Sequence, residues 1–562
     1  MIFEAEEMGL HTERGFSFSV GPQNVMGIEL NSYAAELARV TVWIGEIQWM
    51  LGHGYQPSKD PVLKNLGGIA NMDAVMDEGG REPEWPAADC IIGNPPFLGD
   101  KKMISELGEK YTGALRSLYK GRVPGGADLV TYWYEKARAH IEKGDAKRAG
   151  LVATNSIRGG ASRKVLDRIR ESGRIFHAWS DEPWINEGAA VRVSIVCFSS
   201  PSPPIMGGGV FLDGLPVDEI YSDLTANMEA KGVGLDITVA RKLTENAGVS
   251  FRGMMKGGFF DIPGDLAREW LLRPNPNGRP NSDVLKPSWN GIDIAQQNRD
   301  TWIIDFGVSM TEQEAALYEA PFEHVLKNVK PARQVVRREG HRRYWWRFGE
   351  ARPGLRKAIS NLERYVCTPE VSKHRIYVWG AVQVVPDHML VVFSRSDDTF
   401  FGILHSCFHE LWALKKCSYI GVGNDPRYTT TTIFETFPFP AGLTPDIPAE
   451  KYADDPRAVR TAEAAKRLDE LRENWLNPPE WVKRVPEAVP GYPDRLVPVD
   501  GLAAAELKKR TLTNLYNQRP AWLANAHRDL DAAVAAAYGW PPGLADDEIL
   551  GRLLALNLAR AG

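Results

Sequence analysis

The chain has 562 residues, of which 43% are hydrophobic and 25% are charged, and its formal net charge is −5 at pH 7. This composition excludes disordered, collagenous and coiled-coil chains, and the length is enough for about three to five domains. No apolar run reaches about 18 residues, so we expect no membrane-spanning helix. Because no signal peptide is visible and the five cysteines form no C-x-x-C pair, we expect a cytoplasmic protein with reduced thiols.

The first part of the chain alternates short apolar runs with helical patterns. Strands alternating with helices predict βαβ units and a mostly parallel, doubly wound sheet in an α/β domain over residues 1–200. The expected strands are Asn24–Asn31, Ala88–Gly93, Gly150–Thr154 and Ala190–Phe198, and the expected helices are Ser32–Trp49, Asp128–Ile141 and Arg163–Glu171.

The character of the chain changes after Ser199, where a Pro- and Gly-rich linker begins. Residues 201–440 contain scattered strand signals and few long helical patterns, which predicts an α+β domain. Residues 441–562 are expected to form a helical carboxyl-terminal region, since Asp455–Trp475 and Ala503–Tyr516 have apolar residues at helical spacing.

The most specific motif is Asn94-Pro95-Pro96-Phe97, which directly follows the strand expected at Ala88–Ile92. Two prolines fix the backbone and remove two N–H donors, so the nearby carbonyls and the Asn94 side-chain oxygen remain as uncommitted acceptors. Two acceptors that bind the protons of an amino group favour a tetrahedral nitrogen whose lone pair can attack. Phe97 would supply a face on which a flipped-out base stacks. The alternative is a Pro-rich turn that ends a buried strand.

The chain resembles the N6-adenine DNA methyltransferases and, more closely, the MmeI-like branch of type IIL restriction–modification proteins, in which a methyltransferase domain precedes a target recognition domain. Four segments carry the resemblance: Gly27–Arg39, Asn94–Phe97, Leu151–Arg158 and Asp425–Pro440. It implies a class I, Rossmann-like methyltransferase domain with S-adenosylmethionine as cofactor and double-stranded DNA as partner. It also implies that Glu29 binds the cofactor ribose, that Asp73 binds the cofactor adenine, and that Asn94 and Pro95 accept the protons of the target amino group.

One part of the family pattern has no counterpart in the sequence. Class I methyltransferases open with a strand and a Gly-rich turn, one helix before the residue equivalent to Glu29. Here that helix is expected at Met1–Leu10, and Gly9, Gly15 and Gly21 are isolated. We therefore expect a domain without its first strand and Gly-rich turn, either truncated at the amino terminus or dependent on a missing segment or subunit. The nuclease domain that often precedes the methyltransferase in MmeI-like proteins has no room here, so we expect no endonuclease activity.

Two other functions stay open beside adenine methylation. An amide NH₂ also fits a site with two acceptors, which allows an N-methyltransferase acting on RNA or on protein glutamine. The expected gap in the first domain allows a catalytically silent, DNA-binding remnant. The choice between adenine N6 and cytosine N4 rests on the resemblance alone.

A basic segment lies inside the expected recognition domain. Between Lys327 and Arg375, fourteen Lys and Arg residues stand against four Glu, a local balance of +10, with Trp345 and Trp346 interleaved. We interpret this segment as the electrostatic footprint of a DNA-binding surface, and a merely solvated face is the alternative. The expected DNA-binding residues are Arg337, Arg338, Arg342, Arg343, Arg427 and Tyr428.

A second cluster, His405-Ser-Cys-Phe-His409-Glu410, places two imidazoles four residues apart. This spacing can hold a metal, but the order differs from the His-Glu-x-x-His of zinc hydrolases. We favour a helix whose His and Cys side chains face a core, and we expect no metal site.

Overall fold

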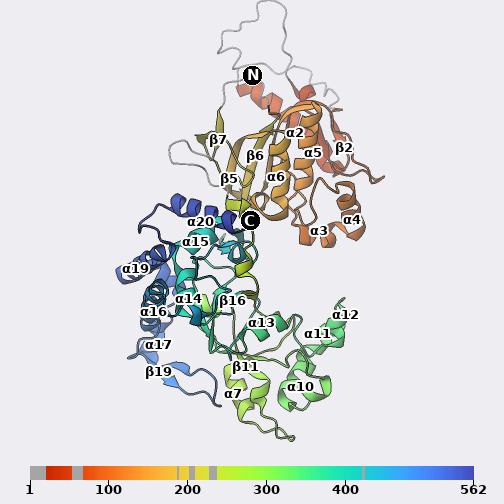
Figure 1. Ribbon diagram of the computed structural model, residues 1–562. Coiled ribbons are helices and arrows are strands. Elements are labelled where there is room, and N and C mark those ends of the chain that lie inside the picture. The colour runs from red at the N-terminus through yellow and green to blue at the C-terminus, as the bar shows by residue number, and fades with distance from the viewer. Residues whose placement is uncertain are drawn as a thin grey trace, which may run out of the picture. The chain divides into compact units, whose positions relative to one another are not determined.

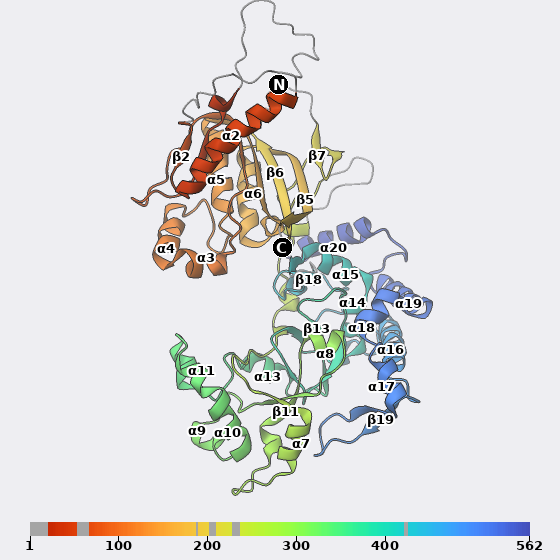
Figure 2. The ribbon, with the colours of Figure 1, turned by 180° about the vertical axis from the view of Figure 1, so that it is seen from behind.

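The computed structural model describes residues 21–52, 67–186, 189–201, 209–226, 237–420 and 425–561. The chain divides into two compact units, Met1–Gly234 and Leu235–Gly562, whose elements are labelled in Figures 1 and 2. The helix expected at Met1–Leu10 lies outside the described residues. Within the described ranges, no helix combines the length and the apolar character needed to cross a bilayer.

The described residues of unit 1 form two separate sheets. A parallel pair consists of β1 (Gly27–Glu29) and β2 (Ile69–Asn71). The larger sheet has six strands in the order β3-β4-β6-β5-β7-β8. Its strands are β3 (Ala88–Gly93), β4 (Ala146–Thr154), β5 (Arg174–Asn186), β6 (Ala189–Ser199), β7 (Val210–Leu212) and β8 (Leu215–Val217).

The α/β class is confirmed, but the expectation of a mostly parallel sheet is wrong. Strands β3 and β4 are parallel, as are β5 and β7, whereas β6 runs antiparallel to both β4 and β5. The sequence patterns missed β5 altogether. Because only two residues separate β5 from β6, these strands can pair only as an antiparallel hairpin.

Helices α3 (Asp100–Leu107), α4 (Glu109–Leu118), α5 (Thr131–Lys143) and α6 (Gly160–Ser172) form the core of unit 1 together with the larger sheet. Helix α2 (Ser32–Gly52) packs instead against β1 and β2. Tyr134 of α5 is fully buried and its hydroxyl donates to the Leu151 carbonyl of β4 at 2.7 Å. The buried side chains of Val165 in α6 and Phe198 in β6 belong to the same cluster.

Unit 2 contains two four-stranded sheets, in the orders β10-β12-β11-β15 and β14-β13-β16-β9. Their strands are β9 (Ser250–Arg252), β10 (Asp261–Pro263), β11 (Leu285–Trp289), β12 (Thr301–Ile304), β13 (Arg364–Pro369), β14 (Val378–Ala381), β15 (Val385–Pro386) and β16 (Leu390–Phe393). The helices between them are α7 (Gly264–Leu272), α8 (Gly291–Ala295), α9 (Glu312–Ala315), α10 (Glu319–Asn328), α11 (Lys330–Gln334), α12 (Glu339–Arg343), α13 (Pro353–Ile359), α14 (Asp398–His405) and α15 (Cys407–Lys416).

The carboxyl-terminal helices share one hydrophobic core with the middle of the chain, since Leu404 and Phe408 belong to the same buried cluster as Leu468 and Leu530. They are α16 (Pro456–Leu476), α17 (Gly501–Leu507), α18 (Leu512–Gln518), α19 (Ala521–Tyr538) and α20 (Asp546–Arg560). Two hairpins accompany them, β17 (Ser418–Ile420) with β18 (Asp425–Arg427) and β19 (Val482–Val485) with β20 (Arg495–Pro498). The helix expected at Ala503–Tyr516 is therefore two helices, and Thr511 caps the second by accepting the Asn514 N–H at 3.1 Å.

Candidate functional site

The side chains expected to carry chemistry follow the carboxyl ends of parallel strands. Glu29 ends β1, Asp73 lies two residues beyond β2, and Asn94 directly follows β3. Thr154 ends β4, which runs parallel to β3. Open α/β sheets place ligand contacts at this edge, because there the chain leaves the sheet through loops that can surround a ligand.

The Asn94–Phe97 motif presents acceptors that nothing in the described part of the chain uses. Asn94 and Pro96 are exposed, Phe97 is half-buried, and Pro95 is buried against the domain. Among the described residues, no donor reaches the Asn94 side-chain oxygen or the carbonyl oxygens of Asn94 and Pro95. This arrangement agrees with the expectation that the two prolines leave oxygens available to an amino group.

Asp128 ties the segment after the motif to the end of β4. Its Oδ1 accepts the Asp100 N–H at 3.1 Å, and its Oδ2 accepts the Ser156 hydroxyl at 2.6 Å. The neighbouring Leu129 N–H donates to the Leu98 carbonyl at 2.9 Å. One carboxylate thus fixes the loop that carries Phe97 against the turn that follows Thr154. The sequence patterns did not single out this residue, whose only signal was that it is polar and stands at the expected start of a helix.

Asp73 organises the turn after β2. Its Oδ1 accepts the N–H groups of Val75 and Met76 at 2.8 and 3.1 Å, and its Oδ2 accepts the Tyr111 hydroxyl at 2.6 Å. Burial, with the hydrogen bond to Asp73 as a smaller cause, raises the pKa of Tyr111 far above its usual range, so the phenol remains a donor. Both carboxylate oxygens therefore have partners within the unit, and a contact between Asp73 and the cofactor adenine stays a prediction.

Glu29 is half-buried and retains one uncommitted oxygen. Its Oε1 accepts the Asn31 N–H at 2.8 Å, whereas no described group bonds to Oε2. The Asn71 side chain donates to the carbonyls of Glu29 and Leu30, each at 2.8 Å, and so holds the end of β1 against β2. A carboxylate placed in this way can accept hydrogen bonds from a pair of hydroxyl groups.

Comparison with known proteins relates unit 1 to a family of methyltransferase domains. Residues 3–206 match the profile of the family described as MmeI, DNA-methyltransferase domain. Unit 1 is an MmeI-like methyltransferase domain. The chain is also similar to the solved structure of the type IIL restriction–modification enzyme MmeI in complex with DNA. The structural alignment covers 100% of this chain and 70% of the MmeI chain, with a TM-score of 0.71 and 18% identity. The whole chain therefore has the fold of MmeI.

A curated relative supports the same assignment for the methyltransferase domain. DNA methyltransferase A of Bacillus subtilis (strain 168) is 28% identical over 199 residues, which make up 32% of this chain. The match spans 21% of the length of that relative.

The basic segment of unit 2 contains two kinds of side chain. Arg333 is buried and donates to the Lys256 carbonyl at 2.7 Å, so it stabilises the unit and is not available to a ligand. Further members of the segment donate in the same way to carbonyls or carboxylates within the unit, namely Arg347, Arg356, Arg364 and Arg375.

Four other arginines of this segment are exposed. Arg337 and Arg338 lie between α11 and α12, whereas Arg342 and Arg343 end α12, and within the described ranges none of them pairs with a carboxylate. Arg342 donates to the carbonyls of Val336 and Arg337 at 2.8 and 3.2 Å, which fixes the turn between the helices. In both ribbon views α11 and α12 project from the rest of unit 2 (Figures 1 and 2). Their charges are therefore available to an external anion.

The structure corrects one expectation about DNA contact. Tyr428 is 1% exposed and its hydroxyl is bonded to His409 Nε2 at 3.0 Å, so this side chain belongs to the core and does not reach DNA. Trp345 and Trp346 are also buried and pack against each other. Arg427 is half-buried and forms an ion pair with Glu370 at 2.7 Å. Its contact with DNA stays a prediction.

The two histidines of the His405–Glu410 segment are buried in a hydrogen-bonded network. His405 Nε2 accepts from the Tyr377 N–H at 3.2 Å and from the Arg472 guanidinium. His409 lies between two phenols, with the Tyr377 hydroxyl 2.9 Å from Nδ1. Burial lowers the pKa of His409 to about 3, so its imidazole is neutral. Both ring nitrogens of His409 and Nε2 of His405 therefore have partners, whereas His405 Nδ1 is buried without one.

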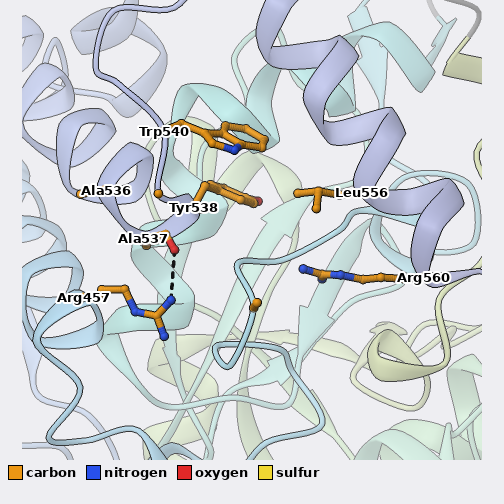
Figure 3. Close-up of a pocket in the computed structure, with 9 residues that line it drawn as sticks. Arg457, Ala536, Ala537, Tyr538, Trp540, Leu556 and Arg560 are labelled. Atoms are coloured by element: carbon orange, nitrogen blue, oxygen red, sulfur yellow. Dashed lines mark hydrogen bonds between the residues drawn. The ribbon is translucent and has the colours of Figure 1, made fainter.

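A hollow of about 200 Å³ opens beside the end of α19 in unit 2 (Figure 3). The rings of Tyr538 and Trp540 stack with centroids 4.4 Å apart along its wall. Its charged groups are committed, since Arg457 pairs with Asp455 at 2.7 Å and Arg560 with Glu245 at 2.8 Å. The charged groups that line the hollow therefore do not indicate a ligand.

Proposed function

We propose that this chain belongs to a site-specific DNA methyltransferase that transfers a methyl group from S-adenosylmethionine to N6 of adenine in double-stranded DNA. The observation that carries the proposal is the Asn94–Phe97 motif at the carboxyl end of β3, whose oxygens have no donor among the described residues. The match of residues 3–206 to the DNA-methyltransferase domain of MmeI supports the reaction class. Adenine as the target base and S-adenosylmethionine as the donor are the family's chemistry and remain part of the proposal.

The residues of the site fit this chemistry. The Asn94 Oδ1 and the Pro95 carbonyl would each accept one proton of the adenine amino group, so that its nitrogen becomes tetrahedral and its lone pair can attack. Phe97 would stack on the base after it leaves the duplex. No strong base is required, since the amino proton can leave after the methyl group has been transferred. Positioning is the main contribution of the protein, and Asp128 holds the two loops involved.

The cofactor would lie between the ends of β1 and β3. It would supply an electrophilic methyl group on a sulfonium. The uncommitted Glu29 Oε2 fits a role as acceptor for the ribose hydroxyls, and Asp73 is the expected partner of the adenine ring. DNA would be held in part by Arg337, Arg338, Arg342 and Arg343, whose guanidinium groups suit phosphate oxygens.

The test is methyl transfer from tritiated S-adenosylmethionine to duplex DNA. We expect label in N6-methyladenine with the unaltered protein, measured by nucleoside chromatography, and only background label with Asn94→Ala. Asn525→Ala, an exposed asparagine on α19, is the matched control and should keep full activity. Label in N4-methylcytosine would mean that the target is N4 of cytosine and not N6 of adenine. DNA binding without any transfer would favour the catalytically silent remnant.

A further inference from the structure

Strands β5 and β6 continue beyond the edge of the larger sheet at which the expected site residues lie. Strand β4 ends at Thr154, which pairs with Val193 of β6. Beyond that pair, β5 and β6 pair with each other as far as Asn186 and Ala189. Because β6 runs antiparallel to β4, this two-stranded extension projects from the carboxyl end of β4. It therefore lies at the same edge of the sheet as Asn94, which follows β3.

A β-bulge lies where this extension leaves the sheet. Two residues of β5, Ser180 and Asp181, oppose the single residue Ser194 of β6. Ser194 is buried, and its hydroxyl donates to the Ser180 carbonyl at 2.7 Å. Bulges are common beside active sites, where the extra residue changes the direction of a side chain. Here the bulge interrupts the regular alternation of β5 at Asp181.

The turn between β7 and β8 holds the bulge in place. The Asp213 carboxylate accepts the Ser180 N–H at 2.6 Å and the Ser180 hydroxyl at 2.8 Å. The Asp213 N–H donates to the Ala178 carbonyl at 2.9 Å. Asp213 has a φ of 52°, in the left-handed region that few residues other than glycine adopt. The Ser180 N–H, which the bulge removes from the ladder, therefore has a side-chain partner.

Asp181 connects the bulge to the turn that follows β4. Its Oδ1 accepts from Arg192 Nε at 2.7 Å and from the Asn155 side chain at 3.2 Å. The Arg192 guanidinium also donates to the Asp181 carbonyl. A guanidinium that bonds both the carboxylate and the carbonyl of one residue restricts the orientation of that carboxylate. Asp181 is thereby fixed with one oxygen on the turn after β4.

The same turn is bonded to the loop of the Asn94–Phe97 motif. Asn155 is followed by Ser156, whose hydroxyl donates to Asp128 Oδ2 at 2.6 Å. Asp128 Oδ1 in turn accepts the Asp100 N–H at 3.1 Å. Hydrogen bonds therefore join the β5–β6 extension, the turn after β4 and the loop that carries the motif.

We propose that Asp181 and Arg192 are positioning residues of the methyltransferase site, which hold the turn after β4 and, through Asp128, the loop of the Asn94–Phe97 motif. Neither side chain would touch the reacting atoms. The inference rests on the proposed function, because this arrangement affects a rate only if a base is methylated there. A small displacement of groups that orient a substrate can lower the rate of the chemical step about 100-fold. DNA and cofactor binding are assigned to other residues, so the effect should appear in kcat and not in KM.

The test compares variants of the full chain in methyl transfer to duplex DNA. We expect Asp181→Ala to lower kcat at least about tenfold, with KM for DNA and for S-adenosylmethionine within about twofold. Asp181→Asn keeps the oxygen that accepts from Arg192 and Asn155, so its kcat should stay within about threefold. Asp145→Ala is the matched control, because it removes an exposed carboxylate that pairs with Lys143 at 3.3 Å, at the amino end of β4. It should change neither constant.

A second variant tests the bond to the turn directly. Asn155→Ala should lower kcat in the same direction, and adding it to Asp181→Ala should cause little further loss, because the two residues share one hydrogen bond. Additive losses in the double variant would contradict this coupling. Asn155→Ala also keeps the proposal testable if Asp181→Ala does not fold.

Amide hydrogen exchange gives a readout that is independent of activity. Residues 97–100 and 154–158 should exchange at least about threefold faster in Asp181→Ala than in Asp145→Ala. Unchanged exchange there, a raised KM with unchanged kcat, or an equal fall of kcat in the control would overturn the proposal. If the unaltered chain transfers no methyl group, the proposed function fails, whereas the exchange result still decides whether Asp181 holds the turn.

Discussion

The exposed arginines of the α11–α12 arm give a prediction that does not depend on catalysis. Arg337, Arg338 and Arg343 are exposed and have no carboxylate partner among the described residues. Each phosphate contact releases counterions, so log Kd against log salt changes by about 0.9 per contact for duplex DNA. Replacing all three by Gln should therefore lower the slope by up to about 2.7. Arg342 is left in place because it holds the turn through two carbonyls.

The assay is fluorescence anisotropy with a labelled duplex at several salt concentrations. The matched control is Arg460→Gln with Lys466→Gln, two exposed cations on α16 that also have no carboxylate partner within the described ranges. It removes charge from another surface and should leave the slope unchanged. An unchanged slope in the triple variant, or an equal reduction in the control, would refute the assignment of DNA contact to this arm.

Three further predictions concern single side chains. Asp128→Ala should lower the free energy of unfolding by about 2 kcal/mol in urea titrations, because it removes the acceptors of the Asp100 N–H and the Ser156 hydroxyl. Asp128→Asn keeps one acceptor oxygen and should lose only about half of that free energy. Equal stability in both variants would contradict the bridge. The pKa of His409 is lowered from 6.5 to about 3 by burial, so its stabilising effect is complete above pH 6.5 and declines as the pH falls toward 3. The loss of unfolding free energy between pH 7.5 and pH 5 should therefore be about 2 kcal/mol smaller in His409→Gln than in the unaltered chain, and an identical pH dependence would count against a buried neutral imidazole. Tyr428→Phe should leave DNA affinity unchanged in the anisotropy assay but lower stability by about 1 kcal/mol, since it removes the donor to His409 Nε2, and weaker DNA binding would revive the expected contact.

Local sequence patterns gave the elements of unit 1 that are buried or amphipathic. The strand expected at Ala88–Gly93 is β3 with identical bounds, and the helix expected at Ser32–Trp49 is α2 extended to Gly52. Local patterns did not predict β5, because the segment Arg174–Asn186 mixes polar, charged and aromatic residues without a clear period. Pairing with β6 on one side and β7 on the other makes it a strand, and that pairing is not visible locally.

The basic segment shows the limit of counting charges. A balance of +10 predicted a DNA-binding surface, but burial removes Arg333 and Arg375 from it and ion pairs occupy Arg356 and Arg364. Residues close in sequence alternate between the core and the surface because short helices turn them to opposite sides. Exposure, which only the folded chain defines, selects the arginines of the α11–α12 arm.

The sequence by itself determined that Asn94–Phe97 combines two prolines, an amide and an aromatic ring directly after an apolar strand, because each of these properties belongs to the residues themselves. It also determined that the first domain is α/β. Only the tertiary structure decided which groups remain available. It showed that both oxygens of Asp73 are bonded while Glu29 keeps one without a partner among the described residues, that Asp128 joins two loops far apart in sequence, and that Tyr428 is buried. Hydrogen-bond commitment and burial depend on neighbours brought together by folding, and no local pattern records them.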